Sequence, residues 1–166
     1  EQRFGKLKRN TLPFSYVGIE HTRINKHLFL HQHTYTSKTK PIHIPKDRLV
    51  TPTSPCTPHE QTQYRSLVCS LLWITLTRMD TVLEVTLLQQ HMVTPTIADM
   101  MMANKLLKKA SKKTHMTGLW YRALAPPYRI LAVADASYAT KHTSYAQEAE
   151  CVLLATDVDF HPVNKS

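Results

Sequence analysis

Residues 57–80 read TPHEQTQYRSLVCSLLWITLTRMD, and the order of polar and apolar residues in this stretch predicts the central helix of the fold. Thr57 can cap the first turn, Pro58 suits the first helical position, and Glu60 completes a capping box. The apolar residues that follow recur at spacings of three and four, which puts them on one side of a helix: Tyr64, Leu67, Val68, Leu71 and Leu72. The stretch therefore predicts an amphipathic helix packed against a core.

Two further helices are expected after this one. Residues 80–92 offer several apolar side chains at helical spacing, namely Val82, Leu83, Val85, Leu87 and Leu88. Thr94 followed by Pro95 is typical of a cap before a third helix, whose apolar residues continue to Ala110: Ile97, Met100, Met101 and Leu107. The pattern predicts a helical region over residues 59–117.

Strands are expected on both sides of the helices. Residues 14–20 and 27–31 resemble a hairpin with a polar turn at 23–26, within an N-terminal region 1–36. Residues 37–58 contain five prolines and predict an extended linker over the surface. After Gly118, strands are expected in one sheet over 118–166: residues 119–124, 128–134 and 151–155, the last two central because they are rich in apolar residues. The expected fold is α+β.

Composition excludes several classes of protein. The chain has 166 residues, 42% apolar and 20% charged, which suits one globular domain or two very small ones. The longest apolar run is Leu71 to Ile74 with its neighbours, far short of the roughly 20 residues that span a bilayer. Three glycines are too few for a P-loop or a dinucleotide-binding turn. We therefore expect no transmembrane segment, no cofactor and no small-molecule substrate.

Positive charge is concentrated in the first part of the chain. Residues 1–134 carry 19 basic and 7 acidic side chains, a surplus of 12, while residues 135–166 carry 2 and 5. Two basic segments are candidates for contact with RNA phosphates: Arg3, Lys6, Lys8 and Arg9 near the start, and Lys105, Lys108, Lys109, Lys112 and Lys113 on the third helix. Their spacing predicts Lys105, Lys109 and Lys112 or Lys113 on one stripe, which is either a phosphate-binding surface or a solvated face.

Several motifs, taken in order, resemble the C-terminal part of a copia-type retrotransposon polyprotein. They read FSYVGI at 14–19, LFLHQ at 28–32 with Tyr35, YRSLVCSLLW at 64–73, TRMD at 77–80, GLWY at 118–121 and LAVADAS at 131–137. In that family these motifs run from late reverse transcriptase, the connection region, into ribonuclease H. The resemblance implies a partial, antiparallel ribonuclease H-like sheet in residues 118–166. It also implies descent from a domain that grips an RNA and DNA duplex.

The departures from the family pattern imply a protein that is not an enzyme. Polymerase chemistry in the family needs an Asp-Asp pair for two metal ions, and no such pair occurs in this chain. Of the ribonuclease H acidic cluster only Asp135 is matched, and the chain stops at Ser166 before the family's next catalytic carboxylate. Cys69 and Met79 replace a usual glycine and proline. We therefore expect neither a catalytic site nor a bound metal.

Two other features have a less specific interpretation. The spacing of His31 and His33 on a strand end could hold Zn²⁺, but a chain with ten histidines produces such pairs often, and no metal is assigned. Three widely spaced cysteines and the lack of a visible secretory signal predict a reducing, intracellular compartment, and an organelle such as the mitochondrion is compatible with this.

These observations favour a structural component of a larger ribonucleoprotein assembly, for example an organellar ribosome. The basic segments would contact RNA phosphates, and the C-terminal sheet would pack on neighbouring proteins. Two alternatives remain open. One is a protein-only structural subunit whose charge meets acidic proteins or lipid headgroups. The other is a fragment cut from an active reverse transcriptase and ribonuclease H polyprotein.

Overall fold

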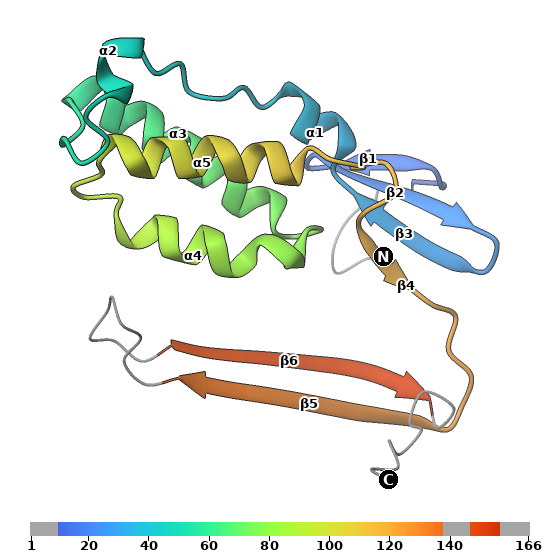
Figure 1. Ribbon diagram of the computed structural model, residues 1–166. Helices are drawn as coiled ribbons and strands as arrows, with labels where there is room; N and C mark the ends of the chain where they lie inside the picture. The colour runs from blue at the N-terminus through green and yellow to red at the C-terminus, as the bar shows by residue number, and fades with distance from the viewer. Residues whose placement is uncertain (1–9, 138–146, 157–166) are drawn as a thin grey trace, which may run out of the picture. The chain divides into compact units, whose positions relative to one another are not determined.

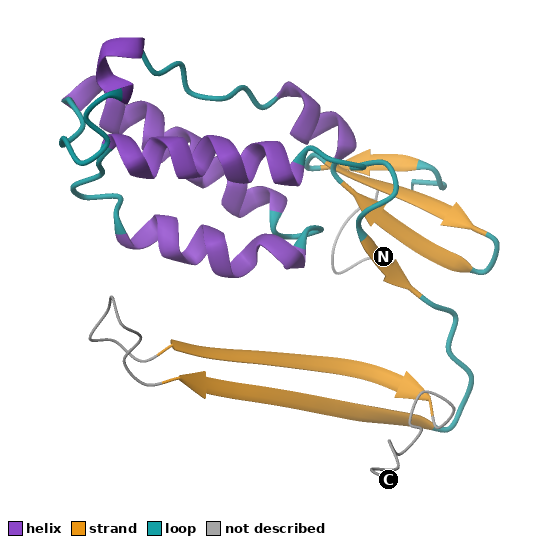
Figure 2. Ribbon diagram, in the orientation of Figure 1, coloured by secondary structure: helices purple, strands orange, loops and turns teal. Residues whose placement is uncertain are grey.

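The structure is a computed structural model that describes residues 10–137 and 147–156. The chain divides into two compact units, Glu1–Tyr121 and Arg122–Ser166, and each is described by itself. The first unit combines an antiparallel sheet with helices, and the second contains a long hairpin (Figures 1 and 2). The expected α+β class is therefore confirmed.

The N-terminal sheet begins as a meander of three strands: β1 (Phe14–Tyr16), β2 (Ile19–Ile24) and β3 (His27–His31). The strand expected at 14–20 is divided because Val17 and Gly18 both have positive φ, 50° and 78°, and form a tight turn. Asn25, with φ of 55°, begins the second turn. The sequence predicted a hairpin of two strands here, and the structure has a meander of three.

The fourth strand of this sheet comes from the far end of the unit. β4 (Leu119–Tyr121) pairs antiparallel with β3, so that Trp120 lies opposite Phe29 and their rings stack with centroids 4.4 Å apart. Grouping 119–124 with the later strands was wrong. A Cβ at Gly118 would lie 2.1 Å from the carbonyl oxygen of Leu30, so only glycine lets the chain enter beside β3.

The linker 37–58 is more structured than its prolines suggest. Helix α1 (His33–Lys38) runs into its start, and a short helix α2 (Lys46–Leu49) lies within it. Ile42 is only 9% exposed and belongs to the hydrophobic core. The expected extended linker therefore contains a short helix, and apolar side chains hold it against the core: Ile42 is buried there, and Ile44 and Cys56 pack against it.

Helix α3 (Pro58–Ile74) confirms the capping box that the sequence predicted. The Thr57 hydroxyl accepts a hydrogen bond from the backbone N–H of Glu60, and the Glu60 carboxylate accepts one from the backbone N–H of Thr57 at 2.8 Å. The expected face is buried except for Leu72, which is 43% exposed and whose place in the core Ile74 takes. The buried face of α3 is therefore slightly rotated about the helix axis from the predicted face.

The remaining helices differ from prediction mainly at their starts. The region expected at 80–92 forms a 3₁₀ turn η1 (Met79–Thr81) and helix α4 (Val82–Gln90). Helix α5 (Ile97–Ala110) is capped by Thr96 rather than Thr94. Thr96 is favoured because its backbone N–H donates to the Asp99 carboxylate at 2.7 Å, which completes a second capping box.

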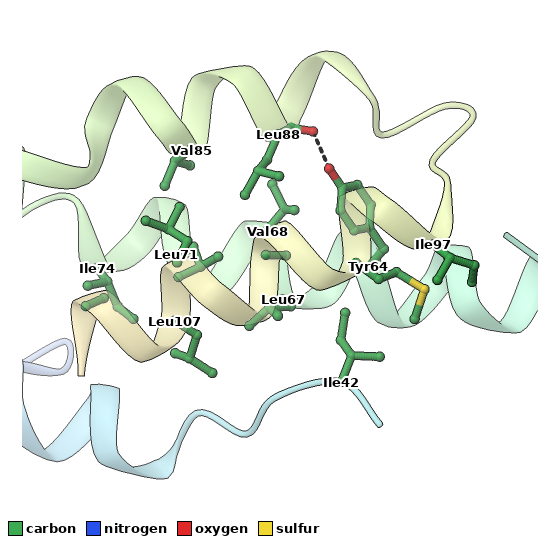
Figure 3. Packing of buried hydrophobic residues seen from close by; sticks show 14 residues of the cluster. Ile42, Tyr64, Leu67, Val68, Leu71, Ile74, Val85, Leu88, Ile97 and Leu107 are labelled. Atoms are coloured by element: carbon green, nitrogen blue, oxygen red, sulfur yellow. Dashed lines mark hydrogen bonds between the residues drawn. The ribbon is translucent and has the colours of Figure 1, made fainter. Parts of the chain in front are cut away.

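The hydrophobic core lies where α3, α4 and α5 pack against one another (Figure 3). Tyr64 is fully buried, and its hydroxyl donates to the carbonyl oxygen of Leu88 at 2.7 Å, which satisfies its one polar atom. Burial raises the pKa of Tyr64. Several side chains expected inside are partly exposed: Val82, Leu83, Leu87 and Met101.

The second unit contains β5 (Tyr128–Ser137) and β6 (Gln147–Thr156), which pair antiparallel over ten residues each. The strands expected at 128–134 and 151–155 are therefore present and longer than predicted. In the described part of this unit each is an edge strand, so their expected central position was wrong. Apolar side chains lie exposed on both faces of the hairpin, among them Ile130 and Leu153.

Candidate nucleic-acid interface

Three of the candidate lysines lie on the outer face of α5. Lys105, Lys108 and Lys109 are exposed, whereas Leu106, Leu107 and Ala110 point into the core. Met101, expected on another face, shares the outer face and is 42% exposed. The positive side chains gather toward the C-terminal end of the helix, where the helix dipole favours them.

The other two lysines lie beyond the helix, which corrects the predicted stripe. α5 ends at Ala110, and Lys112 and Lys113 lie in the following turn, where Lys113 has φ of 52°. Thr114 is only 7% exposed, and its hydroxyl contacts Nδ1 of His33. This contact joins the turn to α1, and Lys112 and Lys113 remain exposed.

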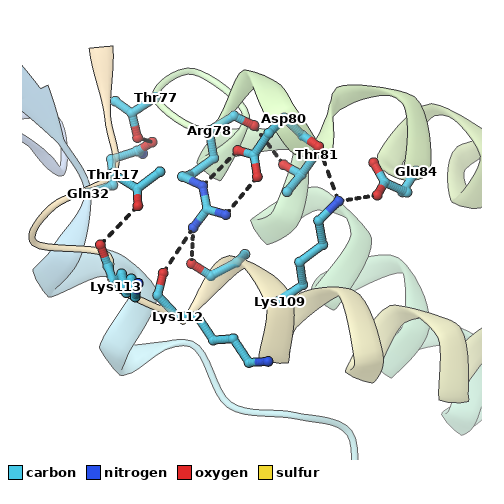
Figure 4. A network of polar contacts seen from close by, with 11 residues as sticks. Gln32, Thr77, Arg78, Asp80, Thr81, Glu84, Lys109, Lys112, Lys113 and Thr117 are labelled. Carbon is cyan, nitrogen blue, oxygen red and sulfur yellow. Dashed lines mark hydrogen bonds and ion pairs between the residues drawn. The ribbon is translucent and has the colours of Figure 1, made fainter. Parts of the chain in front are cut away.

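Lys109 is held within the protein. Its ammonium group contacts the Glu84 carboxylate and donates to the carbonyl oxygen of Asp80 at 3.2 Å, so it joins α5 to α4 (Figure 4). The bond from Lys109 holds the pKa of Glu84 below its usual value. The other lysines make no ion pair with another described residue. We call this group, two residues on α5 and two in the turn that follows it, the α5 lysine face: Lys105, Lys108, Lys112 and Lys113.

A buried arginine fixes the end of α5 beneath these lysines. Arg78 is 7% exposed and donates to both carboxylate oxygens of Asp80, each at 2.8 Å, and to the carbonyl oxygen of Ala110 at 2.5 Å (Figure 4). The bond from Arg78 lowers the pKa of Asp80. Thr77 donates to the side-chain oxygen of Gln32 at 2.9 Å, which ties the end of α3 to the sheet.

We call the hydrogen bonds from Arg78 to Asp80 and Ala110 the Arg78 clamp. The sequence analysis did not predict this structural role of Arg78. The TRMD motif at 77–80 was used there only as part of a resemblance. The sequence did contain a pattern that indicates this role: an Arg-x-Asp motif directly after an amphipathic helix. An arginine in that position can donate to the last carbonyl oxygens of a neighbouring helix. The motif positions the α5 lysine face without belonging to it.

Most acidic side chains in residues 10–121 are engaged by partners within the fold. Residues 10–121 contain 13 Lys and Arg against 6 Asp and Glu. Five of these carboxylates pair with a side chain of the fold: Glu20 with His31, Glu60 with Arg48, Asp80 with Arg78, Glu84 with Lys109 and Asp99 with His91. The hydrogen bonds from Arg48 lower the pKa of Glu60 to about 2. The exposed surface of this unit is therefore strongly positive.

The remaining predicted residues do not form a catalytic or metal site in the described chain. Asp135 is exposed on β5 opposite Ala149, so it lies on the other face of the hairpin from Glu148 and Glu150. No group of three or more His, Cys, Asp or Glu that could hold a metal occurs within residues 10–137 and 147–156. The basic residues near the start, Arg3, Lys6, Lys8 and Arg9, lie outside the described residues.

The two neighbouring histidines have separate partners. Nδ1 of His31 lies 2.9 Å from the Glu20 carboxylate, and Nδ1 of His33 contacts Thr114. Burial alone would raise the pKa of Glu20, but hydrogen bonds from Thr34 and the charge of His31 outweigh it and lower the value. The His31 and Glu20 contact joins β3 to β2, which is a structural role.

Comparison with known proteins adds no relative: no family model, curated protein or solved structure matches this chain. Among the helices of the described residues, none is long and apolar enough to cross a membrane.

Proposed function

We propose that this chain binds the phosphate backbone of RNA and serves as a structural component of a larger ribonucleoprotein assembly. The observation that carries the proposal is the α5 lysine face, whose four cations make no ion pair with another described residue, in a unit whose carboxylates are mostly engaged elsewhere. Backbone phosphates are the common polyanion that such a surface attracts, through release of counterions.

We further propose that the chain derives from a copia-type reverse transcriptase and ribonuclease H region and is catalytically incomplete. The order of the motifs supports the descent. The sequence lacks an Asp-Asp pair, and Asp135 faces away from Glu148 and Glu150, which supports the loss of catalysis. Three free cysteines support a reducing, intracellular compartment.

Neighbouring proteins are the second proposed class of partner. Ile130, Val152 and Leu154 are 77%, 68% and 59% exposed on one face of the β5 and β6 hairpin. Exposed apolar side chains gathered on one face are typical of surfaces that a protein partner covers. This observation also favours the alternative of a protein-only structural subunit, so the test must separate RNA from protein.

The test measures RNA binding by fluorescence anisotropy at about 50 and 200 mM salt. The variant Lys105→Glu with Lys112→Glu removes two members of the α5 lysine face. The control, Lys26→Glu with Lys46→Glu, changes the net charge equally at two other exposed lysines. We expect the first variant to weaken binding and to reduce the salt slope by about one per lysine, with the melting temperature unchanged.

Equal binding by both variants would contradict the proposal and leave the lysines as a solvated face. Sedimentation of the native protein with and without ribonuclease provides a second test. A large particle that ribonuclease disrupts supports the ribonucleoprotein, and one that survives favours the protein-only subunit. A metal-dependent cleavage of RNA in an RNA and DNA hybrid, abolished by Asp135→Asn, would contradict the loss of catalysis.

A further inference from the structure

A groove lies between the linker and helix α3. It has a volume of about 820 Å³. We call it the linker groove and define it by six of its lining residues: Tyr35, Lys38, Lys40, His43, Gln63 and Ser66. Its volume falls within the range of roughly 300–1,000 Å³ typical of small-molecule pockets, and the groove is open to solvent along one side.

The wall formed by the linker is held in place. The backbone N–H of Ile42 donates to the side-chain oxygen of Asn104 at 2.8 Å, and the Asn104 amide donates back to the carbonyl oxygen of Ile42 at 2.8 Å. The Ile42 side chain is also part of the core. A wall fixed in this way loses little conformational entropy on binding, so the groove is preorganised.

The charge of the groove is positive. Lys38 and Lys40 are exposed along its linker wall, and His43 also lines the groove. None of the residues that line the groove is acidic. Glu60, near the start of α3, is neutralised by Arg48, whose Nη2 lies 2.9 Å from its carboxylate. The electrostatics of the groove therefore favour an anionic ligand over a neutral or a cationic one.

The other groups on the walls match a nucleotide. Tyr35 is half-buried and contributes an aromatic ring, while Gln63 and Ser66 offer an amide and a hydroxyl. An aromatic ring beside a line of cations is the combination that binds single-stranded nucleic acid, because a base stacks on the ring and phosphates meet the cations. A duplex is recognised across successive grooves of a helix and needs a far larger surface.

We infer that the linker groove binds a short segment of single-stranded RNA, with phosphates at Lys38 and Lys40 and a base against Tyr35. This inference rests on the proposed function and adds a second contact to it. The linker passes beside α5 at Asn104, and α1 meets the turn after α5 where His33 contacts Thr114. Lys38 and Lys40 lie in the chain between these two attachments.

The test compares the binding of two RNA probes of equal charge, a labelled single strand of mixed sequence and a hairpin duplex. Ser66→Trp fills the groove without changing charge. Cys69→Trp is its matched control, because Cys69 is exposed on α3 but does not line the groove. We expect Ser66→Trp to weaken single-strand binding about tenfold and to leave duplex binding within about twofold. Circular dichroism melting identifies any variant that fails to fold.

A second variant changes the charge of the groove instead of filling it, so its effect does not depend on the size of a tryptophan side chain. Lys38→Glu with Lys40→Glu is expected to lower single-strand affinity at least as much as Ser66→Trp does. If both groove variants bind the single strand normally while Lys105→Glu with Lys112→Glu weakens binding, the groove inference fails and the proposed function stands. If none of the variants weakens binding, both fail. Equal losses for single strand and duplex, or equal competition by an acidic peptide, would also overturn the groove inference.

Discussion

The helical core and the β5 and β6 hairpin are both rich in leucine, isoleucine and valine, yet they bury these side chains to very different extents. Leu71 and Val68 in α3 are 1% and 0% exposed, whereas Ile130 and Val152 in the hairpin are 77% and 68% exposed. The core residues are covered because α3, α4 and α5 all pack against one another. Apolar composition alone therefore does not produce a core, since each apolar face needs an opposing layer.

In the described chain no second layer of secondary structure covers the faces of the β5 and β6 hairpin within its own unit. Its ten-residue strands pair the backbone groups that face each other, but the ribbon still has two faces and two edges whose backbone groups point outward. A two-stranded hairpin by itself is marginally stable in water. Its stability is therefore expected to depend on what covers it, while that of the helical core depends on the core's own packing.

The largest expected effect comes from truncating one leucine in each region. Leu71→Ala should lower the free energy of unfolding by about 2–5 kcal/mol because it leaves a cavity in a closed core. Leu154→Ala, at a position 59% exposed, should change it by no more than about 0.5 kcal/mol. Both tryptophans, Trp73 and Trp120, lie in the first unit, so urea unfolding followed by fluorescence reports on that unit.

A loss from Leu154→Ala equal to that from Leu71→Ala would break the comparison, because it would mean that the hairpin contributes to the core of the first unit.

The next effect concerns the polar side of the helical core. Arg78→Met should destabilise the protein by about 2 kcal/mol, because the carbonyl oxygen of Ala110 and the Asp80 carboxylate lose their donors. Asp80→Asn is the control, since it keeps the bond from Arg78 to Ala110 and should cost less. Thermal unfolding by circular dichroism measures both, and the reverse order of losses would mean that the ion pair matters more than the clamp.

The third prediction concerns the starts of α3 and α5, where side-chain caps stabilise the first unit. In the described chain such caps occur only in that unit. Thr57→Ala and Thr96→Ala should each cost about 1 kcal/mol, since each removes an acceptor for a backbone N–H of the first turn. Serine at either position keeps the hydroxyl and should restore most of the loss. Urea midpoints of the four variants provide the measurement, and an unaffected alanine variant would show that its cap is dispensable.

The smallest effect is a pH dependence at the start of α3. Arg48 holds the pKa of Glu60 at about 2, below its usual 4.5, so Glu60 stabilises the folded state fully above about pH 4.5. This contribution is lost as the pH falls toward 2, because protonation then removes the ion pair. Glu60→Gln keeps a capping box but carries no charge.

Wild type and Glu60→Gln should therefore differ in stability at pH 6 by more than they do near pH 2. Urea unfolding across this interval measures the difference, and parallel curves would mean that the ion pair with Arg48 does not contribute.

Local features were predictable from the sequence. The cap and apolar face of α3 were correct to within one residue of the buried set, because both depend on contacts a few residues apart. The cap of α5 was assigned to Thr94 instead of Thr96, because Thr-Pro is a general signal and the choice between two threonines depended on the position of Asp99. Two histidines with suitable metal spacing were given separate partners by the fold.

The candidate interface was predictable in its charge but not in its geometry. The sequence located the lysines, yet it could not show that Glu84 engages Lys109 or that Lys112 lies beyond the helix. It also gave no sign that Lys38 and Lys40 line a groove with Ser66, because these residues are far apart in the sequence and meet only in the folded chain.

By itself, then, the sequence determined the α+β class, the positive charge of the first unit and the helix capped by Thr57. The tertiary structure decided the partner of β4, the clamp made by Arg78, and which lysines keep their charge unpaired among the described residues. The division has a physical cause. Capping and periodicity are interactions between near neighbours, whereas strand partners and ion pairs join residues that only the folded chain brings together.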